Sequence, residues 1–288
     1  MQASPSSFAD TELRANILIA YPYWNDEGAK LLAANQDAVR LVVDSGAFTA
    51  WKAGKPIALD DYCRFIEGLP VTPWRYFTLD VIGDPDGSMR NYETMLKRGF
   101  KPVPIFTRGE DPSVLEDYYK TSDVVGIGGL VGTQDNKGYV NGIMRRVARR
   151  KAHWLGFATM NYVKHYHPYM CDMSTWEQGG RFGNVRLYMG NGRLVSVKKT
   201  DCAKQPSAEI MERIRYFGFD PYDLRKREAW HGGESINRKL SVASALALSL
   251  DVHKNLGTLM FNAIADTGRG VRFFVGAYRR QMALRRAA

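Results

Sequence analysis

The chain has 288 residues, 45% of them hydrophobic, which is enough for one large domain with an ordinary apolar core. It has no run of 18 apolar residues, no basic-then-apolar leader and only three widely separated cysteines. We therefore expect no membrane span, no disulfide framework and no zinc ribbon, and we expect a cytoplasmic protein. The net charge of +10 favours a polyanionic partner such as nucleic acid, although a solvated basic surface would give the same charge.

Short apolar segments alternate with amphipathic segments through the first 176 residues. The expected strands are 16–24, 39–48, 75–83, 101–109, 123–132, 152–159 and 169–175. The expected helices between them are 26–35, 59–69, 86–99, 111–122, 138–150 and 161–168. This alternation is typical of βαβ units with a parallel sheet, and their number predicts an α/β fold of the (β/α)8, TIM-like barrel type. The alternative is an open doubly wound sheet, although no G-x-G-x-x-G follows the first strand.

The alternation weakens after residue 176. Residues 186–197 predict a hairpin that turns at 190–192 and either supplies or decorates the last strand. A long helix is expected at 235–257, and a basic amphipathic helix at 271–288. We therefore expect a single domain over residues 1–288, with the barrel core at about 14–200 and a basic helical C-terminal extension at about 205–288.

Carboxylates close three of the expected strands, at Asp44, Asp80 and Asp172, and a Gly-Gly turn at 128–129 follows the fifth strand. In (β/α)8 barrels the active site forms at the C-terminal ends of the strands. Each of these aspartates could instead cap the helix that follows it. A fourth aspartate, Asp84, stands directly before a proline and a helical stretch, and for this one we favour the helix cap. Three acids that converge on one end of the barrel nevertheless predict an active site there.

The histidines lie mostly outside this pattern. His165 and His167 form an H-x-H pair that could bind a metal, but they follow the sixth strand at a distance from its end. His231 is expected in a loop, near the mouth of the barrel or elsewhere. We expect neither a metal nor a cofactor.

Three short motifs together resemble the tRNA-guanine transglycosylase superfamily. DSGAF (44–48) resembles the family's DSGGF/Y motif, and GIGGLVG (126–132) resembles its GGLAVG loop. CDMSTW (171–176) stands where the family places its nucleophilic aspartate. The order and spacing agree over about residues 40–176. The chain lacks the family's C-x-C-x-x-C zinc site, and in this it is closer to the short DpdA-type transglycosylases that modify DNA.

The resemblance implies roles for the acids. Asp172 would attack the anomeric C1′ and hold the sugar as a covalent intermediate, because a carboxylate can capture an oxocarbenium-like centre. Asp44 would act as the acid/base near the purine. Asp80 would hydrogen-bond the Watson–Crick edge of the base, and Phe48 would stack on it.

The resemblance also implies how the rest of the base is recognised. The backbone at Gly128, Gly129 and Leu130 would read another polar edge of the base. Arg108 stands where the family has a base-reading glutamine, so the base preferred here could differ.

Basic residues outside these motifs would contact the phosphates of DNA, the expected partner. The residues expected in this role are Arg181, Lys198, Lys199, Arg279 and Arg280. A free 7-deazapurine base would be the second substrate if the enzyme exchanges guanine for it. Two alternatives stay open: a hydrolytic DNA glycosylase that leaves abasic sites, and a non-catalytic module that binds nucleic acid.

Overall fold

An eight-stranded parallel sheet forms the centre of the molecule. The computed structural model describes residues 10–147, 149–177, 183–204 and 206–287. Along the sheet the strands follow the order β3-β2-β1-β10-β7-β6-β5-β4, and every pairing is parallel. The strands are β1 Ala15–Ala20, β2 Val39–Asp44, β3 Arg75–Tyr76, β4 Ile105–Phe106, β5 Val125–Ile127, β6 Ala152–Trp154, β7 Met170–Met173 and β10 Leu259–Ile264.

The two edge strands of this sheet approach each other. Immediately beyond β3, Phe77 forms a parallel bridge with Val103, which lies just before β4. The backbone N–H of Thr78 donates to the carbonyl of Val103 at 2.9 Å, and the N–H of Val103 donates to the carbonyl of Tyr76 at 2.8 Å. The sheet is therefore strongly curled, which confirms the α/β class and is compatible with a TIM-like barrel.

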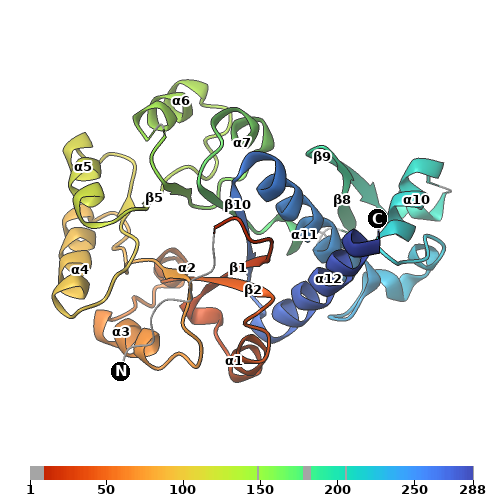
Figure 1. Cartoon of the computed structure of the whole chain (residues 1–288), viewed down its shortest axis with the longest axis horizontal. Helices are drawn as coiled ribbons and strands as arrows, with labels where there is room; N and C mark the ends of the chain where they lie inside the picture. Colours follow the sequence, from red (N-terminus) through yellow and green to blue (C-terminus); the bar gives the residue numbers. More distant parts are fainter. Residues whose placement is uncertain (1–9, 148, 178–182, 205, 288) are drawn as a thin grey trace.

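Helices surround the curled sheet (Figure 1). Those expected after the first six strands are present, as are the two long C-terminal helices, with their ends shifted by a few residues. They are α1 Asp26–Ala33, α3 Leu59–Glu67, α4 Pro85–Lys97, α5 Pro112–Thr121, α6 Lys137–Arg146, α7 Met160–Tyr166, α11 Ile236–Leu256 and α12 Thr267–Ala287. Other helical segments are η1 Tyr21–Tyr23, α2 Ala47–Lys52, α9 Lys199–Ala203, α10 Ala208–Tyr216, η2 Asp223–Arg225 and η3 Arg227–Trp230.

Apolar side chains fill the inner face of the curled sheet. This inner core contains Leu18, Val42, Phe77, Val103, Ile105, Val124, Met170, Leu259 and Phe261. Alternation along β7 places Met170 and Asp172 on this face, while Cys171 packs in the larger core between sheet and helices. Asp172 pairs in register with Phe261 of β10, so it stands directly above the inner core.

The eighth strand of the sheet is β10, which lies in the part of the chain expected to be a helical extension. The expected core range of about 14–200 therefore misses one strand, and the hairpin at 184–198 does not supply it. That hairpin pairs β8 Asn184–Gly190 with β9 Arg193–Lys198 as a separate two-stranded sheet. Its turn is at Asn191-Gly192, as predicted.

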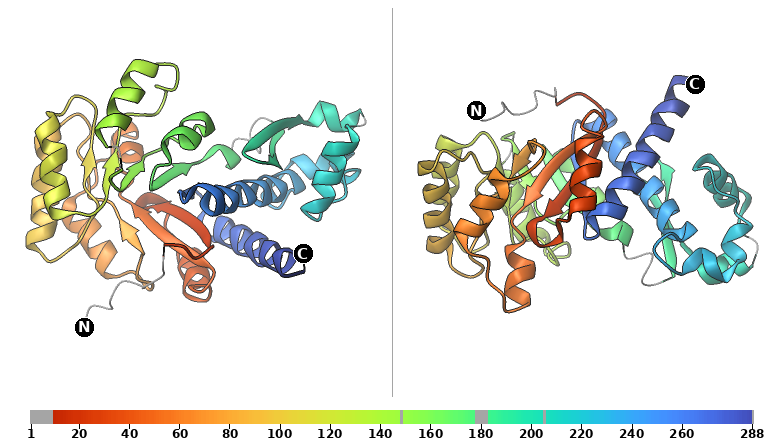
Figure 2. Two further views of the ribbon diagram at one scale, coloured as in Figure 1. Left: turned by 45° about the horizontal axis from the view of Figure 1, so that its top comes forward. Right: turned by 90° about the horizontal axis from the view of Figure 1, so that it is seen from below.

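The hairpin packs on α11 and extends the molecule beyond the barrel-like part. The hydroxyl of Ser244 on α11 accepts from the backbone N–H of Tyr188 and donates to the carbonyl of Arg186 at 2.8 Å. Because the sheet covers one side of α11 and the hairpin the other, this helix is buried nearly all round. In Figures 1 and 2 this lobe, β8 to η3, lies at the opposite end of the molecule from α4 and α5.

The C-terminal helix α12 is part of the main fold. It packs against α1 and α11, and Val271, Phe274 and Val275 are buried in the larger core between sheet and helices, which we call the outer core. We expected this basic helix to belong to an extension outside the barrel core, and that a truncation at Gly270 would test its part in binding. The structure instead makes α12 the helix that follows the eighth strand, so truncation there would expose the core.

Candidate active site

The C-terminal ends of the strands form one end of the curled sheet, which we call the mouth. Asp44 is the last residue of β2, and its Oδ2 accepts from the N–H of Gly46 at 2.9 Å. Gly46 has φ 73°, and a Cβ there would lie 2.3 Å from Cδ of Pro22. The glycine therefore lets the chain turn sharply into α2. The strand was expected to continue to residue 48, and this was wrong, because α2 begins at Ala47.

A second acid joins Asp44 from the neighbouring strand. Asp80 follows β3, and its Oδ1 accepts from the hydroxyl of Ser45 at 3.2 Å. The amide of Asn91 on α4 donates to the carbonyl of Leu79 at 2.9 Å, which holds this segment in place. The segments that follow β2 and β3 are thus joined by the hydrogen bond from Ser45 to Asp80.

The electrostatics of Asp44 depend on its burial and on the other two acids. Desolvation is the largest effect, and together with the charges of Asp80 and Asp172 it raises the pKa of Asp44 to about 7. The hydrogen bond from Gly46 opposes this rise in pKa. Burial also raises the pKa of Asp80 above its usual value. Near neutral pH, Asp44 can therefore either donate or accept a proton.

Asp172 contributes the third acid from β7 and is almost buried, at 7% exposed. Its Oδ1 accepts from the N–H of Gly156 at 2.7 Å and lies 2.9 Å from Nε2 of His153. Within the described part of the chain, both hydrogen bonds of this carboxylate go to Oδ1. Oδ2 is left without a hydrogen-bond partner there, so its lone pairs are available to a ligand.

His153 is a site residue that the sequence analysis missed. It lies at the centre of β6 and is fully buried on the inner face of the sheet, with Phe77 edge-on at 4.9 Å between ring centroids. Its Nδ1 has no hydrogen-bond partner among the described residues. A neutral imidazole carries one N–H, so the proton belongs on Nε2, where the Asp172 carboxylate accepts it. The period-two alternation of β6 would have placed His153 on the same inner face as Asp172.

The residues expected to contact a base lie around this mouth. Phe48 is on α2 and is 54% exposed. The guanidinium of Arg108, after β4, lies 4.8 Å from the ring centroid of Tyr139. Gly129 has φ 70°, and a Cβ there would lie 2.9 Å from Cβ of Arg108, so these two segments are in close contact.

The side chain of Leu130 is fully buried in the outer core, so only its backbone can face a ligand. Gly128 adjoins Thr107, whose Cγ2 would lie 3.1 Å from a Cβ at that glycine. Val131 lies against Gly156, since a Cβ there would be 2.7 Å from Cγ2 of Val131. The loop after β5 thus reaches the residue whose N–H binds Asp172.

The residues expected to contact phosphates are not brought to one place. Arg279 donates to Asn35 at 2.6 Å, and Asn35 precedes β2, so this arginine lies at the end of the sheet opposite the mouth. Arg280 lies against Gly218 of the lobe. Lys198 and Lys199 lie where the hairpin joins α9. Arg181 lies outside the described residues.

Other expectations concern residues away from the mouth. Asp84 caps α4, with Oδ1 accepting from the N–H of Gly87 at 2.9 Å, which confirms that interpretation. His165 lies on α7 against the ring of Tyr166, and His167 ends that helix with Nε2 at 2.9 Å from the carbonyl of Lys164. The exposed His231 follows η3.

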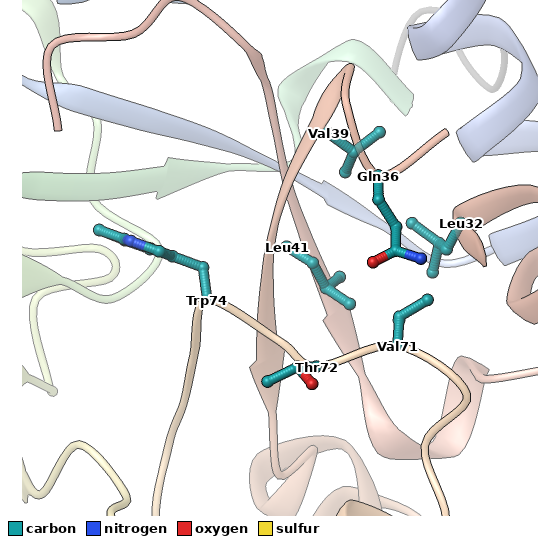
Figure 3. Close-up of a pocket in the computed structure, with 7 residues that line it drawn as sticks. All are labelled: Leu32, Gln36, Val39, Leu41, Val71, Thr72 and Trp74. Carbon is teal, nitrogen blue, oxygen red and sulfur yellow. The ribbon is translucent and has the colours of Figure 1, made fainter. Parts of the chain in front are cut away.

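The pocket drawn in Figure 3 is not part of this site. It lies on the outer side of β2, between α1 and residues 71–74, where Leu41 and Val71 line it and the amide of Gln36 is one of its few polar groups. A second small pocket lies between the end of β7, the hairpin and α11, lined by Met173, Trp176 and Leu248 among others. Neither is lined by the three acids.

Comparisons of the chain with protein-family models, with curated proteins and with solved structures give no match. None of the helices in the described ranges is both long enough and apolar enough to cross a membrane.

Proposed function

We propose that this protein is an enzyme, built on a closed (β/α)8 barrel, that cleaves an N-glycosidic bond in DNA and exchanges guanine for a 7-deazaguanine. The observation that supports this most directly is the set of three acids at the mouth, which differ in environment. Asp172 offers one oxygen without a hydrogen-bond partner in the described chain, and the pKa of Asp44 is raised to about 7. A nucleophile and a proton carrier are the two groups that a retaining glycosyl transfer needs.

In the first half of the reaction, Oδ2 of Asp172 forms a bond to C1′ of the deoxyribose while the bond from C1′ to N9 of the guanine breaks. The electron pair of the broken bond stays on the base. Protonated Asp44 gives its proton to the base, which leaves as neutral guanine. The products are an aspartyl–sugar ester and the Asp44 carboxylate.

The second half reverses these roles. The Asp44 carboxylate removes the N9 proton of an incoming 7-deazaguanine, and N9 attacks C1′ as the ester bond to Asp172 breaks. Asp172 returns as a carboxylate and Asp44 returns protonated. If water attacks instead, the product is an abasic site and the enzyme is a glycosylase.

Three further features support nucleic acid as the substrate. The motifs at 44–48, 126–132 and 171–176 resemble those of tRNA-guanine transglycosylases, and the mouth gathers all three segments. The chain carries a net charge of +10. It lacks the family's zinc motif, which favours DNA over tRNA.

The test is chromatography of the bases released from several natural DNAs, with and without a free 7-deazaguanine base. Release of guanine that depends on the added base, together with its incorporation into DNA, is the expected result. If abasic sites form without added base, the reaction is hydrolysis rather than base exchange. No release of any base from any DNA would overturn the proposed chemistry.

His153 acts in this mechanism as a positioning residue. Its Nε2–H and the N–H of Gly156 both bind Oδ1 of Asp172, so the carboxylate is oriented with Oδ2 available for C1′. The imidazole itself is fully buried, so in this mechanism it acts on Asp172 and not on the sugar.

His153→Leu should lower kcat for base release while leaving KM nearly unchanged. A hydrogen bond to a charged group contributes about 1.5–3 kcal/mol, so the expected loss is about tenfold to a hundredfold. His153→Gln keeps an N–H donor and should recover part of the rate. The measurement is steady-state base release together with the fraction of enzyme trapped as the sugar ester.

Phe77→Leu is the control, because it alters packing beside the same imidazole without removing a hydrogen bond from Asp172. If Phe77→Leu lowers kcat as much as His153→Leu, and glutamine gives no recovery, His153 is only a core residue.

A further inference from the structure

The exposed large apolar side chains of this protein gather at the mouth. The described residues include seven such side chains, and five of them follow the C-terminal ends of strands. These are Tyr23 after β1, Phe48 and Trp51 after β2, Val81 after β3 and Val131 after β5. The other two, Tyr216 and Tyr222, lie in the lobe. Exposed apolar side chains that gather on one side of a molecule, rather than lying scattered, indicate a binding surface.

The most prominent part of this surface is the aromatic pair on α2. Phe48 and Trp51 are 54% and 57% exposed, and their rings are nearly parallel, with centroids 6.0 Å apart. The buried face of this short helix consists of Ala47 and Ala50. The small residues therefore anchor α2 to the sheet, and the two large rings point outward rather than into the core.

The charged residues on α2 and directly after it are positive. Nζ of Lys52 lies 4.4 Å from the ring centroid of Phe48, and the exposed Lys55 follows three residues later, after the end of α2. Residues 47–55 contain no acidic residue. Open aromatic faces with adjacent cations match the two parts of an unpaired nucleotide, since the base can stack on the ring while the phosphate meets the ammonium group.

The pair is also close in the chain to the candidate acid, Asp44. Only Ser45 and Gly46 separate Asp44 from α2, and Gly46 turns tightly against Pro22. A nucleotide on α2 would therefore be a near neighbour of the one whose sugar meets Asp172.

We propose that Trp51, backed by Phe48, stacks on an unpaired base that flanks the target nucleotide, while Lys52 and Lys55 face its phosphate. The substrate is then a single strand or a locally opened duplex. This inference rests on the proposed function, because it assigns the strand state of the substrate at the same site.

The test compares two labelled strands of equal length and charge by fluorescence anisotropy. One is oligodeoxythymidylate, which contains no guanine and so is not turned over. The other carries abasic tetrahydrofuran units in place of every nucleotide base. The wild-type protein should bind the thymidylate strand more tightly. Trp51→Ala should weaken binding of that strand by about tenfold, because stacking contributes about 1–3 kcal/mol per base.

The abasic strand should bind equally well to the wild type and to Trp51→Ala. Trp51→Phe should keep most of the preference for bases. Tyr222→Ala is the matched control, since Tyr222 is 46% exposed and also has a cation over its ring, that of Arg225 at 4.8 Å, but lies in the lobe. It should bind both strands as the wild type does.

Equal binding of both strands by the wild type, or equal weakening of both by Trp51→Ala, would overturn the stacking proposal. The proposal would also be overturned if the protein bound a fully paired duplex more tightly than oligodeoxythymidylate and Trp51→Ala weakened binding of both to the same extent. If bases are released but the protein binds the thymidylate and abasic strands equally, the proposed function is supported and this inference is wrong. Binding that depends on the bases, without release of any base, would support the stacking surface and contradict the proposed enzymatic activity.

Discussion

Asp172→Asn should reduce base release by at least about a thousandfold and leave affinity for DNA nearly unchanged. An amide cannot form the ester with C1′ and carries no negative charge to stabilise the developing sugar cation. Asparagine has nearly the same shape and keeps an oxygen at the Oδ1 position. The N–H of Gly156 and the Nε2–H of His153 can still donate to that oxygen, so the fold should be preserved.

Two measurements separate this chemical role from a structural one. Base release is followed by chromatography, and the covalent intermediate is sought as a protein band shifted by DNA on a denaturing gel. The band should be present for the wild type and absent for Asp172→Asn. Asp84→Asn is the matched control, because Asp84 caps α4 and asparagine caps a helix about equally well. If Asp172→Asn abolishes DNA binding or lowers the melting temperature as much as activity, the acid is structural.

The confirmed parts of the fold were predictable because their signals are local. Each of the first seven strands is a short apolar run between turn residues and a helix, and parallel strands align their C-terminal ends at one mouth. The rule that parallel strands align their C-terminal ends therefore predicts that Asp44, Asp80 and Asp172 lie together. The contact of Ser45 with Asp80 and the joint effect of Asp80 and Asp172 on the pKa of Asp44 agree with this prediction.

The eighth strand was not predictable in the same way. The sequence LMFNAI at 259–264 lies between two helices of 21 residues, and a short buried strand has no periodicity that separates it from a buried helix. The helix α2 was missed because its six residues continue the apolar run of β2, and because its N-cap is a glycine without a capping side chain. Both elements are decided by tertiary packing rather than by local pattern.

His153 shows what a search for polar segments overlooks. The histidines considered from the sequence lie in polar surroundings, whereas His153 lies inside an apolar strand and interacts with an acid from the next strand in the sheet. The phosphate contacts expected at Arg279 and Arg280 failed to converge on the mouth for a different reason. A helix that follows a strand runs back toward the opposite end of the sheet, so the basic C-terminal half of α12 points away from the site.

Asp44→Asn should lower base release by about a hundredfold or more and remove one limb of the pH–rate profile. In the proposed mechanism the protonated form of Asp44 starts the reaction. Because the pKa of Asp44 is raised to about 7, the wild-type rate should fall as the pH rises above about 7. Rates measured from pH 5 to pH 9 should show this fall in the wild type and not in Asp44→Asn.

The neighbouring acid provides a sharper check on the origin of that limb. Asp80 is the first of the two charges that raise the pKa of Asp44, after desolvation. Asp80→Asn should therefore move the limb to lower pH, whatever it does to the maximal rate. A limb that stays in place in Asp80→Asn, or that persists in Asp44→Asn, would assign the titration to another group.

The same pKa predicts how stability changes with pH. The pKa of Asp44 is higher in the folded protein than its unperturbed value of 3.8, so folding favours the protonated form. Ionising this buried acid therefore costs stability, a cost that grows from about pH 4 to about pH 7 and is constant above it. Asparagine removes the cost and can still accept from the N–H of Gly46. Thermal melting should show Asp44→Asn to be more stable than the wild type at pH 8, with the difference shrinking toward pH 4. A difference that is independent of pH would mean that Asp44 is not held in this high-pKa environment, and the proton carrier of the proposed mechanism would have to be another residue.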